Sequence, residues 1–503
     1  MTAQETFEEL CAHARETAIL ESISGLLGWD ERTKMPPRGG EYRAEQMTYM
    51  AGQIHRRQTD PQLGQWLSEL AESELAADPH SDAGAAIRVM RRQFDKRTKL
   101  PQSLVEELTR ASVLGQQQWV EARKNNDFKG FAPQLEKIFD LRRQEAEAVG
   151  YDEVPYDALL DDYEPGEKTS NVARVLEGLR EELVPLVSAI ADSGKSPDRN
   201  LLKRHFPKAQ QESFGTMAAA KIGFDFERGR LDETHHPFCG GAGPHDVRMT
   251  TRYDEAFFPS AFYSILHEAG HGIYEQGLRP DWFGLPPGTY NSLGIHESQS
   301  RLWENLVGRS RAFWQYFLPD AKKAFPDALG DVALDDVHFA VNDVQASLIR
   351  VEADEATYNL HIIIRFELEQ ALINGDLPVG DLPGAWNEKY QHYLGIRPPD
   401  DADGVLQDVH WSAALVGYFA TYSLGNLYAS QFFDQAQAEL GDLHAQFAAG
   451  QFEPLRAWLE EKVYRVGQCV PAADLVQQVT GKPLSHGPLM EHLRGSVGAL
   501  YGI

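Results

Sequence analysis

Apolar residues recur at helical spacing through most of this chain, and this pattern constrains the fold more than any other feature. It is clearest between Val337 and Asn374, a stretch without proline or glycine in which apolar side chains recur in alternating steps of four and three. We predict one uninterrupted helix over Val337–Ile373. Similar patterns predict further helices at Gln4–Leu27, Glu41–Ala76, Ser103–Lys124, Gln134–Val149, Val172–Ile190, Pro259–Gln276, Gln299–Arg311, Leu382–Leu394 and Leu406–Leu440. The chain is therefore expected to be mainly α-helical.

The breaks between the predicted helices are short, and none resembles a long flexible linker. Asp246–Tyr253 alternates β-branched with polar residues just after a glycine-rich turn, which predicts a strand of a small sheet. A chain of 503 residues has room for about three domains. The short breaks instead favour a single large helical domain over residues 1–503, with a small sheet.

The charge of the chain argues against two classes of partner. There are 48 Lys and Arg against 75 Asp and Glu, a net charge of −27, and no local block of basic residues offsets it. Such a chain has no electrostatic attraction to nucleic-acid phosphates or to anionic lipid headgroups. We expect neither nucleic acid nor a membrane as a partner.

Cysteine usage and the N-terminus both bear on the compartment. The 3 cysteines lie far apart and lack CxxC spacing, which favours a reducing compartment over a disulfide framework. Residues 1–20 are acidic and amphipathic and do not have the pattern of a signal peptide. The charge-free run Val409–Phe433 is long enough to span a bilayer, but its many polar residues favour a buried helix. We expect a cytoplasmic protein.

The motif with the clearest chemical meaning is His267-Glu268-Ala269-Gly270-His271, an HExxH sequence. It lies within a predicted helix, so the two histidines share one helix face and their imidazoles can bind one ion. Glu268 can then reach a water held by that ion and accept its proton. The spacing predicts a catalytic metal site, against the simpler interpretation of two ordinary histidines on a helix.

A site of this kind needs a third ligand. One class of zinc peptidases has a glycine three residues and a histidine six residues after the second histidine; the chain has Tyr274 and Gly277 there, which excludes that class. The other option is a glutamate from a following helix, and Glu297 lies at the start of the next helical run. Two histidines and one glutamate leave an open coordination position, as in catalytic zinc sites. His296 is expected to point to another face.

Several further segments match, in order, the motifs of the carboxypeptidase Taq family of thermostable metallocarboxypeptidases, which the chain resembles over nearly its whole length. Besides HExxH, they are Trp29-Asp30-Glu31, Met35-Pro36, Arg43-Ala44-Glu45-Gln46, His236-Pro237-Phe238, DxRxT at 246–250, His296-Glu297-Ser298-Gln299, IRxxAD at 349–354 and GxxQDxHW at 404–411. The resemblance implies a mostly helical fold with a deep central groove and the metal on its floor. It also implies a homodimer.

The same resemblance implies the activity and its principal residues. The family's exopeptidases remove C-terminal residues with broad side-chain tolerance and depend on zinc or cobalt, one divalent ion per chain being expected here. Carried onto this sequence, His267, His271 and Glu297 bind the metal, and Glu268 is the general base that activates the attacking water.

An exopeptidase must also bind the terminal carboxylate of its substrate, which calls for an arginine. Arg350 in the IRxxAD motif is the first candidate, with Asp354, one helical turn on, to orient it. Arg248 in the DxRxT motif is the second. Arg248 could instead form a structural ion pair with Asp246, or its strand could bind the substrate backbone as an edge strand.

A further donor should face the oxyanion that develops during hydrolysis. His410, Tyr418 and Tyr422 are candidates within the charge-free segment, and we prefer Tyr422; each tyrosine could instead be an ordinary core residue. Tyr418 and Gln407 are also candidates for substrate binding. Gln407 and Asp408 are expected mainly to support the residues that touch the substrate.

Two alternative functions stay open from the sequence. The nearer one is a metal-dependent oligopeptidase that cuts internal bonds and does not read the C-terminus. The more distant one is a helical binding or scaffold protein with an inert HExxH sequence, which would bind no metal.

Overall fold

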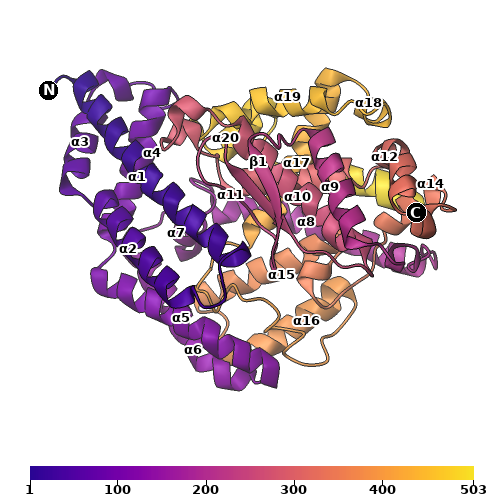
Figure 1. Cartoon of the computed structure of the whole chain (residues 1–503). Helices are drawn as coiled ribbons and strands as arrows, with labels where there is room; N and C mark the ends of the chain where they lie inside the picture. Colours follow the sequence, from indigo (N-terminus) through magenta and orange to yellow (C-terminus); the bar gives the residue numbers. More distant parts are fainter. The chain divides into compact units, whose positions relative to one another are not determined.

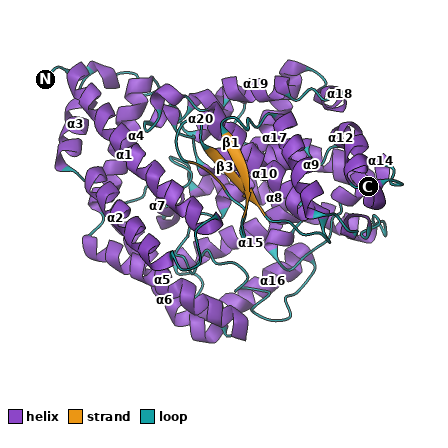
Figure 2. Cartoon of the chain, viewed as in Figure 1, coloured by secondary structure: helices purple, strands orange, loops and turns teal.

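The computed structural model describes residues 1–503, and it is mainly helical with a small sheet, as predicted (Figures 1 and 2). The chain forms two compact units. Unit 1 comprises Met1–Arg97, Asp198–Val341 and Phe432–Lys482, and unit 2 comprises Thr98–Pro197, Asn342–Gln431 and Pro483–Ile503. Each unit is thus built from three segments that are far apart in the sequence. The single domain over residues 1–503 stays a prediction.

Unit 1 holds the N-terminal helices, the sheet and the helix that carries the HExxH sequence. Its helices are α1 (Ala3–Thr33), α2 (Gly40–Gln58), α3 (Pro61–Ala71), α4 (Asp82–Lys99, all but its last two residues), α9 (Lys208–Ile222), α10 (Phe258–Gly277), α11 (Leu293–Arg301), α12 (Arg311–Ala324), α13 (Pro326–Leu329), α14 (Leu334–Val341), α18 (Leu443–Ala448), α19 (Glu453–Lys462) and α20 (Ala472–Thr480). A π-helix at Leu302–Val307 continues directly from α11.

Unit 2 contains helices and irregular segments but no strand. Its helices are α5 (Gln102–Asn125), α6 (Phe128–Val149), α7 (Pro155–Leu160), α8 (Thr169–Asp192), α15 (Glu355–Asn374), α16 (Leu382–Leu394), α21 (Gly487–Leu493) and α22 (Ala499–Tyr501). The helix α17 (Ala420–Leu440) is divided between the units at Gln431. Helix α15 is buried on nearly every side, and its buried residues include the polar side chains of Asn359, His361, Arg365 and Glu369.

The sheet has three strands in the order β1-β3-β2: β1 (Gly229–Glu233), β2 (Cys239–Gly241) and β3 (Val247–Thr251). β3 pairs in parallel with β1, with Arg230 opposite Arg248, and antiparallel with β2, with Gly240 opposite Arg248. The predicted strand is therefore present, and α10 packs against it. Because β3 is the central strand, the expectation that it binds a substrate backbone as an edge strand is wrong.

The prediction of one helix over Val337–Ile373 is wrong. Helix α14 ends at Val341, a single 3₁₀ turn covers Arg350–Glu352, and α15 begins at Glu355. The Asp354 side chain caps α15 by accepting hydrogen bonds from the N–H groups of Ala356 and Thr357 at 3.0 and 2.9 Å. The break also contains the point, after Val341, at which the chain passes from unit 1 to unit 2.

The predicted helix over Leu406–Leu440 begins later than expected, at Ala420. Gly417 has a φ of +90° and its N–H donates to Oε2 of Glu369 at 3.0 Å. A Cβ on Gly417 would lie 2.7 Å from the carbonyl carbon of Leu159. The segment before α17 is therefore held in an irregular course that helical spacing alone did not reveal.

Two other predicted helices are each divided in the structure. Glu41–Ala76 contains α2 and α3, separated at Asp60, whose side chain accepts a hydrogen bond from the Gln62 N–H. Gln299–Arg311 contains the end of α11, the π-helix and the first residue of α12. None of the helices combines the length and the apolarity needed to cross a bilayer.

Candidate metal centre and arginine cluster

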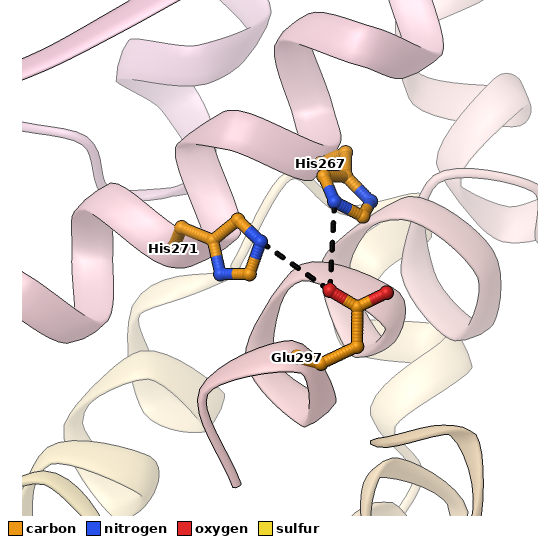
Figure 3. A group of neighbouring side chains, drawn as sticks. All are labelled: His267, His271 and Glu297. Carbon is orange, nitrogen blue, oxygen red and sulfur yellow. Dashed lines mark ion pairs between the residues drawn. The ribbon is translucent and has the colours of Figure 1, made fainter. Parts of the chain in front are cut away.

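The two histidines of the HExxH sequence lie one turn apart on α10, on the same side of the helix (Figure 3). Pro259 occupies the first turn of the helix, where its missing N–H costs nothing. The centroids of the His267 and His271 rings are 4.9 Å apart. The local sequence thus presents two imidazoles to one point in space.

Helix α11 brings Glu297 to the same point. The Ser292 side chain caps this helix by accepting a hydrogen bond from the Ile295 N–H at 3.1 Å. Oε2 of Glu297 lies 3.7 Å from Nε2 of His267 and 3.4 Å from Nε2 of His271. One ligand atom from each of the three residues lies within 4.8 Å of the other two. Two imidazole nitrogens and one carboxylate oxygen fit a divalent metal and leave coordination positions open.

The close approach of α10 and α11 depends on Gly270, between the two histidines. A Cβ at this position would lie 2.5 Å from the carbonyl oxygen of Gln299 and 2.7 Å from Cα of Ser300. These are backbone atoms of α11, so a side chain could be accommodated only by moving that helix. The glycine in HExxH therefore helps to set the distance between Glu297 and the histidines.

The π-helix after α11 supplies a carboxylate that orients the first histidine. Nδ1 of His267 lies 2.8 Å from Oε2 of Glu304. Arg301 bridges the two glutamates: Nε donates to Oε1 of Glu297 at 2.7 Å and Nη1 donates to Oε2 of Glu304 at 3.3 Å. Nη2 of Arg309 donates to Oε1 of Glu304 at 3.4 Å. These contacts leave Nε2 of His267 and Oε2 of Glu297 directed toward one another.

The charges at this site suit metal ligands. Burial lowers the pKa of His271 to about 3, so its imidazole is neutral at pH 7. Although burial opposes it, the positive charges of Arg301 and His267 hold the pKa of Glu297 well below its usual range. Against burial, Arg301 and His267 likewise lower the pKa of Glu304 to about 2. Both glutamates are therefore anionic.

Glu268 lies next to the first histidine and is only 6% exposed. Burial, reinforced by the negative charges of Glu297 and Glu304, raises its pKa to about 7. A divalent cation beside these carboxylates would favour the ionised form. Such a carboxylate is suited to accept and return a proton near neutral pH.

His296 takes part in the site without facing the three ligands. Its Nε2 lies 2.9 Å from Oε1 of Glu275, and its ring stacks on that of His271 with centroids 4.5 Å apart. His296 is not among the three residues whose ligand atoms lie close together.

The second predicted group of site residues lies in unit 2 around Asp408. Arg350 is 5% exposed, and its Nε and Nη2 donate to Oδ2 and Oδ1 of Asp408 at 3.1 and 3.0 Å. Its Nη1 donates to the hydroxyl of Tyr358 at 2.9 Å. The expectation that Asp354 orients Arg350 is wrong, because Asp354 caps α15 and Asp408 holds the guanidinium instead.

Gln407 supports Arg350 through the backbone. Its Oε1 accepts a hydrogen bond from the Arg350 N–H at 2.8 Å, and its Nε2 donates to the Leu348 carbonyl oxygen and to the Tyr390 hydroxyl, both at 2.9 Å. The amide thus fixes the 3₁₀ turn that carries Arg350. The role of Gln407 in supporting residues that touch the substrate, or in binding substrate itself, stays a prediction.

The three candidate oxyanion donors lie together in unit 2. Nε2 of His410 is 3.3 Å from the Tyr422 hydroxyl oxygen, and the His410 ring lies 5.6 Å from that of Tyr418. The guanidinium carbon of Arg350 lies 5.0 Å from the centroid of the Tyr422 ring. Burial lowers the pKa of His410 to about 3 and raises that of Tyr422 well above its usual value, so both groups are neutral at pH 7.

Arg248 forms an ion pair with Asp246, the structural alternative that the sequence left open. Its Nε and Nη2 donate to Oδ1 and Oδ2 of Asp246 at 2.8 and 2.9 Å, and its guanidinium carbon lies 4.3 Å from the ring centroid of Trp29. This bidentate pair occupies Nε and Nη2, the same two atoms that Asp408 occupies on Arg350. The role of Arg248 in carboxylate binding stays a prediction.

Sequence reasoning missed Glu304, Arg301 and Arg365. The sequence could have predicted that Glu304 lies near the site. It follows Glu297 by seven residues in the same helical run, which is about two turns away on the same face. Arg365 lies on the face of the predicted helix that also holds His361, but nothing in the sequence pairs it with Asp408.

Comparison with known proteins identifies relatives over the full chain. The family model for carboxypeptidase Taq (M32) metallopeptidases matches residues 9–497. The chain is 46% identical to thermostable carboxypeptidase 1 of Thermus thermophilus, with all of both chains covered, and 38% identical to carboxypeptidase 1 of Bacillus subtilis, with 95% of each covered.

Solved structures show the same fold. An M32 carboxypeptidase from Deinococcus radiodurans R1 superposes with a TM-score of 0.96 at 42% identity, covering 99% of this chain and 100% of that one. Metallocarboxypeptidase 1 of Trypanosoma cruzi superposes with a TM-score of 0.91 at 32% identity, covering 99% of each chain.

Proposed function

The chain belongs to the carboxypeptidase Taq (M32) family of metallopeptidases, and from this premise we propose which residues carry out its peptide hydrolysis. His267, His271 and Glu297 hold the divalent metal. The observation that carries this assignment is the grouping of their three ligand atoms within 4.8 Å, with Glu304 on the far nitrogen of His267. A carboxylate on the second nitrogen of a ligating histidine is typical of metal sites.

A divalent ion held by these three residues would supply acidification of a water and polarisation of the carbonyl of the peptide bond that is cut. Glu268 accepts the proton of the attacking water and passes it to the amine of the departing residue. Its burial and its position beside His267 support this role. The raised pKa of Glu268, about 7, suits a group that must both take up and release a proton.

Arg350 binds the terminal carboxylate of the peptide. A guanidinium has five N–H donors, and Asp408 and Tyr358 use three of those of Arg350. One N–H on each Nη atom remains, which is what a carboxylate needs for a bidentate contact. Asp408 and Gln407 hold the side chain and backbone of Arg350 in place, so little conformational entropy is lost on binding.

Tyr422 donates a hydrogen bond to the developing oxyanion. Its pKa is raised by burial and by the nearby tyrosines, so it keeps its proton. His410, 3.3 Å from its hydroxyl, orients it, and Tyr418 lines the same cluster. Zinc as the metal, with cobalt as the alternative, a homodimer and a cytoplasmic location stay predictions.

The test is digestion of a defined peptide with a free C-terminus, followed by mass spectrometry of the products with and without a chelator. We expect stepwise loss of single C-terminal residues, abolished by the chelator and restored by a divalent metal. The same peptide with an amidated C-terminus is the matched control. Undiminished cleavage of the amide, or internal cuts, would favour the oligopeptidase alternative. Activity that no chelator affects would contradict the metal site.

A further inference from the structure

A second arginine shares the carboxylate that holds Arg350. Arg365, on α15, is 1% exposed, and its Nη2 lies 3.0 Å from Oδ2 of Asp408. The same carboxylate receives Nε and Nη2 of Arg350. Asp408 is thus engaged by two guanidinium groups in the buried interior of unit 2.

Hydrogen bonds do not compensate for the burial of the Arg365 guanidinium. Both Nη atoms are buried without an acceptor in hydrogen-bonding geometry. The guanidinium carbon instead lies 4.7, 4.5 and 4.5 Å from the ring centroids of Trp386, Trp411 and Phe419. Aromatic faces stabilise a cation, but a buried charge is costly without full pairing. A residue that served packing alone would not need a charge here.

The other ionisable groups near Arg365 make no hydrogen bond to its Nη atoms. Burial lowers the pKa of His361 and of His410 to about 3, so both are neutral. Glu369 receives hydrogen bonds from Tyr156, Trp411 and the Gly417 N–H rather than from Arg365. Burial raises the pKa of Glu369, whereas these hydrogen bonds and the charge of Arg365 lower it.

We propose that Arg365 is a positioning residue that keeps a net positive charge at Arg350 for recognition of the substrate carboxylate. Arg350 paired with Asp408 alone would form a neutral pair and would attract an anion weakly. With Arg365 on the same carboxylate, two positive charges face one negative charge, and one positive charge remains. This inference rests on the proposed role of Arg350.

The experiment is a double-mutant cycle on KM and kcat for a peptide with a free C-terminus. Arg365→Met leaves Arg350 neutralised by Asp408, so KM should rise about tenfold or more while kcat changes by less than about threefold. In Arg365→Met/Asp408→Asn the opposing charge is also removed, while the amide oxygen can still accept a hydrogen bond that holds Arg350 in place. The KM of the double variant should therefore fall at least about threefold below that of Arg365→Met.

Arg365→Lys separates the effect of the positive charge at position 365 on KM from the effect of the planar guanidinium group. A lysine beside Asp408 can keep the positive charge but not the planar stacking on the aromatic rings, so its KM should lie between those of the wild type and Arg365→Met. If Arg365→Met does not fold, two other variants still test the proposal. The lysine variant keeps a cation beside Asp408, and the double variant has no carboxylate at position 408 that needs one. Arg180→Gln is the matched control, because it removes an arginine that pairs with Glu367 of the same helix. Its KM should be that of the wild type.

The outcomes separate this inference from the function on which it rests. If Arg350→Met raises KM but Arg365→Met does not, Arg365 has no such role and the carboxylate site stands. If the double variant is worse than Arg365→Met, or the lysine variant is as impaired as the methionine variant, the charge argument is wrong. If Arg350→Met leaves KM unchanged, both the carboxylate site and this inference are wrong.

Discussion

Nδ1 of His267 lies 2.8 Å from Oε2 of Glu304, a residue that follows Glu297 by about two turns on the π-helix after α11. This contact determines which nitrogen of His267 faces the other two ligands. Arg301 ties the orienting glutamate to the ligating one by contacting both. Single π turns often occur at functional sites, and here the turn places Glu304 against the histidine.

Glu304→Gln should weaken metal binding without removing a ligand. Glutamine cannot supply the negative charge that holds His267, so we expect affinity to fall by about 10- to 100-fold. Competition with a chromophoric chelator measures it. Glu182→Gln is the matched control, because Glu182 makes a similar contact of 2.9 Å with His486, a histidine in unit 2 rather than in the metal centre. Equal affinities of the two variants would contradict the orienting role of Glu304.

Glu268→Gln should separate metal binding from turnover. The amide has nearly the same shape as the carboxylate but cannot take up a proton, so kcat should fall by about 10²- to 10⁴-fold. Metal content, measured by elemental analysis of the purified variant, should equal that of the wild type, because Glu268 is not a ligand. A variant with near-normal kcat would exclude Glu268 as the general base.

The sequence predicts the helical fold and the shared helix face of His267 and His271 well, because both depend on local spacing. An HExxH sequence places two histidines on one face of any helix that contains it, and α10 is that helix. The prediction of one helix over Val337–Ile373 is wrong for a physical reason. Apolar periodicity continues through the break, but Val337 and Val341 belong to unit 1 whereas Tyr358 and Ile362 belong to unit 2.

The arginine cluster could be predicted only in part. The motifs that contain Arg350 and Asp408 are both visible in the sequence, but the residues lie 58 positions apart. Their pairing depends on tertiary packing, and so does the sharing of Asp408 with Arg365. Asp354 lies four residues after Arg350 in the same motif, yet its local hydrogen bonds make it a helix cap.

The buried histidine His361 should make the protein less stable in mild acid. Burial and the nearby charge of Arg350 lower its pKa from about 6.5 to about 3. Between these values the unfolded chain binds a proton that the folded chain does not, so stability rises with pH and falls on acidification. The contribution of this group is at most about 1.4 kcal/mol per pH unit.

Thermal unfolding midpoints between pH 7 and pH 5 measure this effect. Removing the imidazole in His361→Gln should give a shallower decrease of the midpoint with falling pH. His235→Gln is the control, because His235 is exposed, and its decrease should match the wild type. An unchanged pH dependence in His361→Gln would show that this histidine does not contribute.

Gly270→Ala should damage the metal centre through the backbone. The new Cβ would lie 2.5 Å from the Gln299 carbonyl oxygen, so α11 must move and carry Glu297 away from the histidines. We expect the free energy of unfolding to fall by about 1–3 kcal/mol and metal affinity to fall with it. Denaturant unfolding of the metal-free protein and chelator competition measure the two effects.

Gly52→Ala is the matched control, because no atom lies within 4 Å of its added Cβ on α2. That variant should gain about 0.5–1 kcal/mol and bind metal normally. Normal metal affinity in Gly270→Ala would show that the spacing of α10 and α11 does not depend on this glycine.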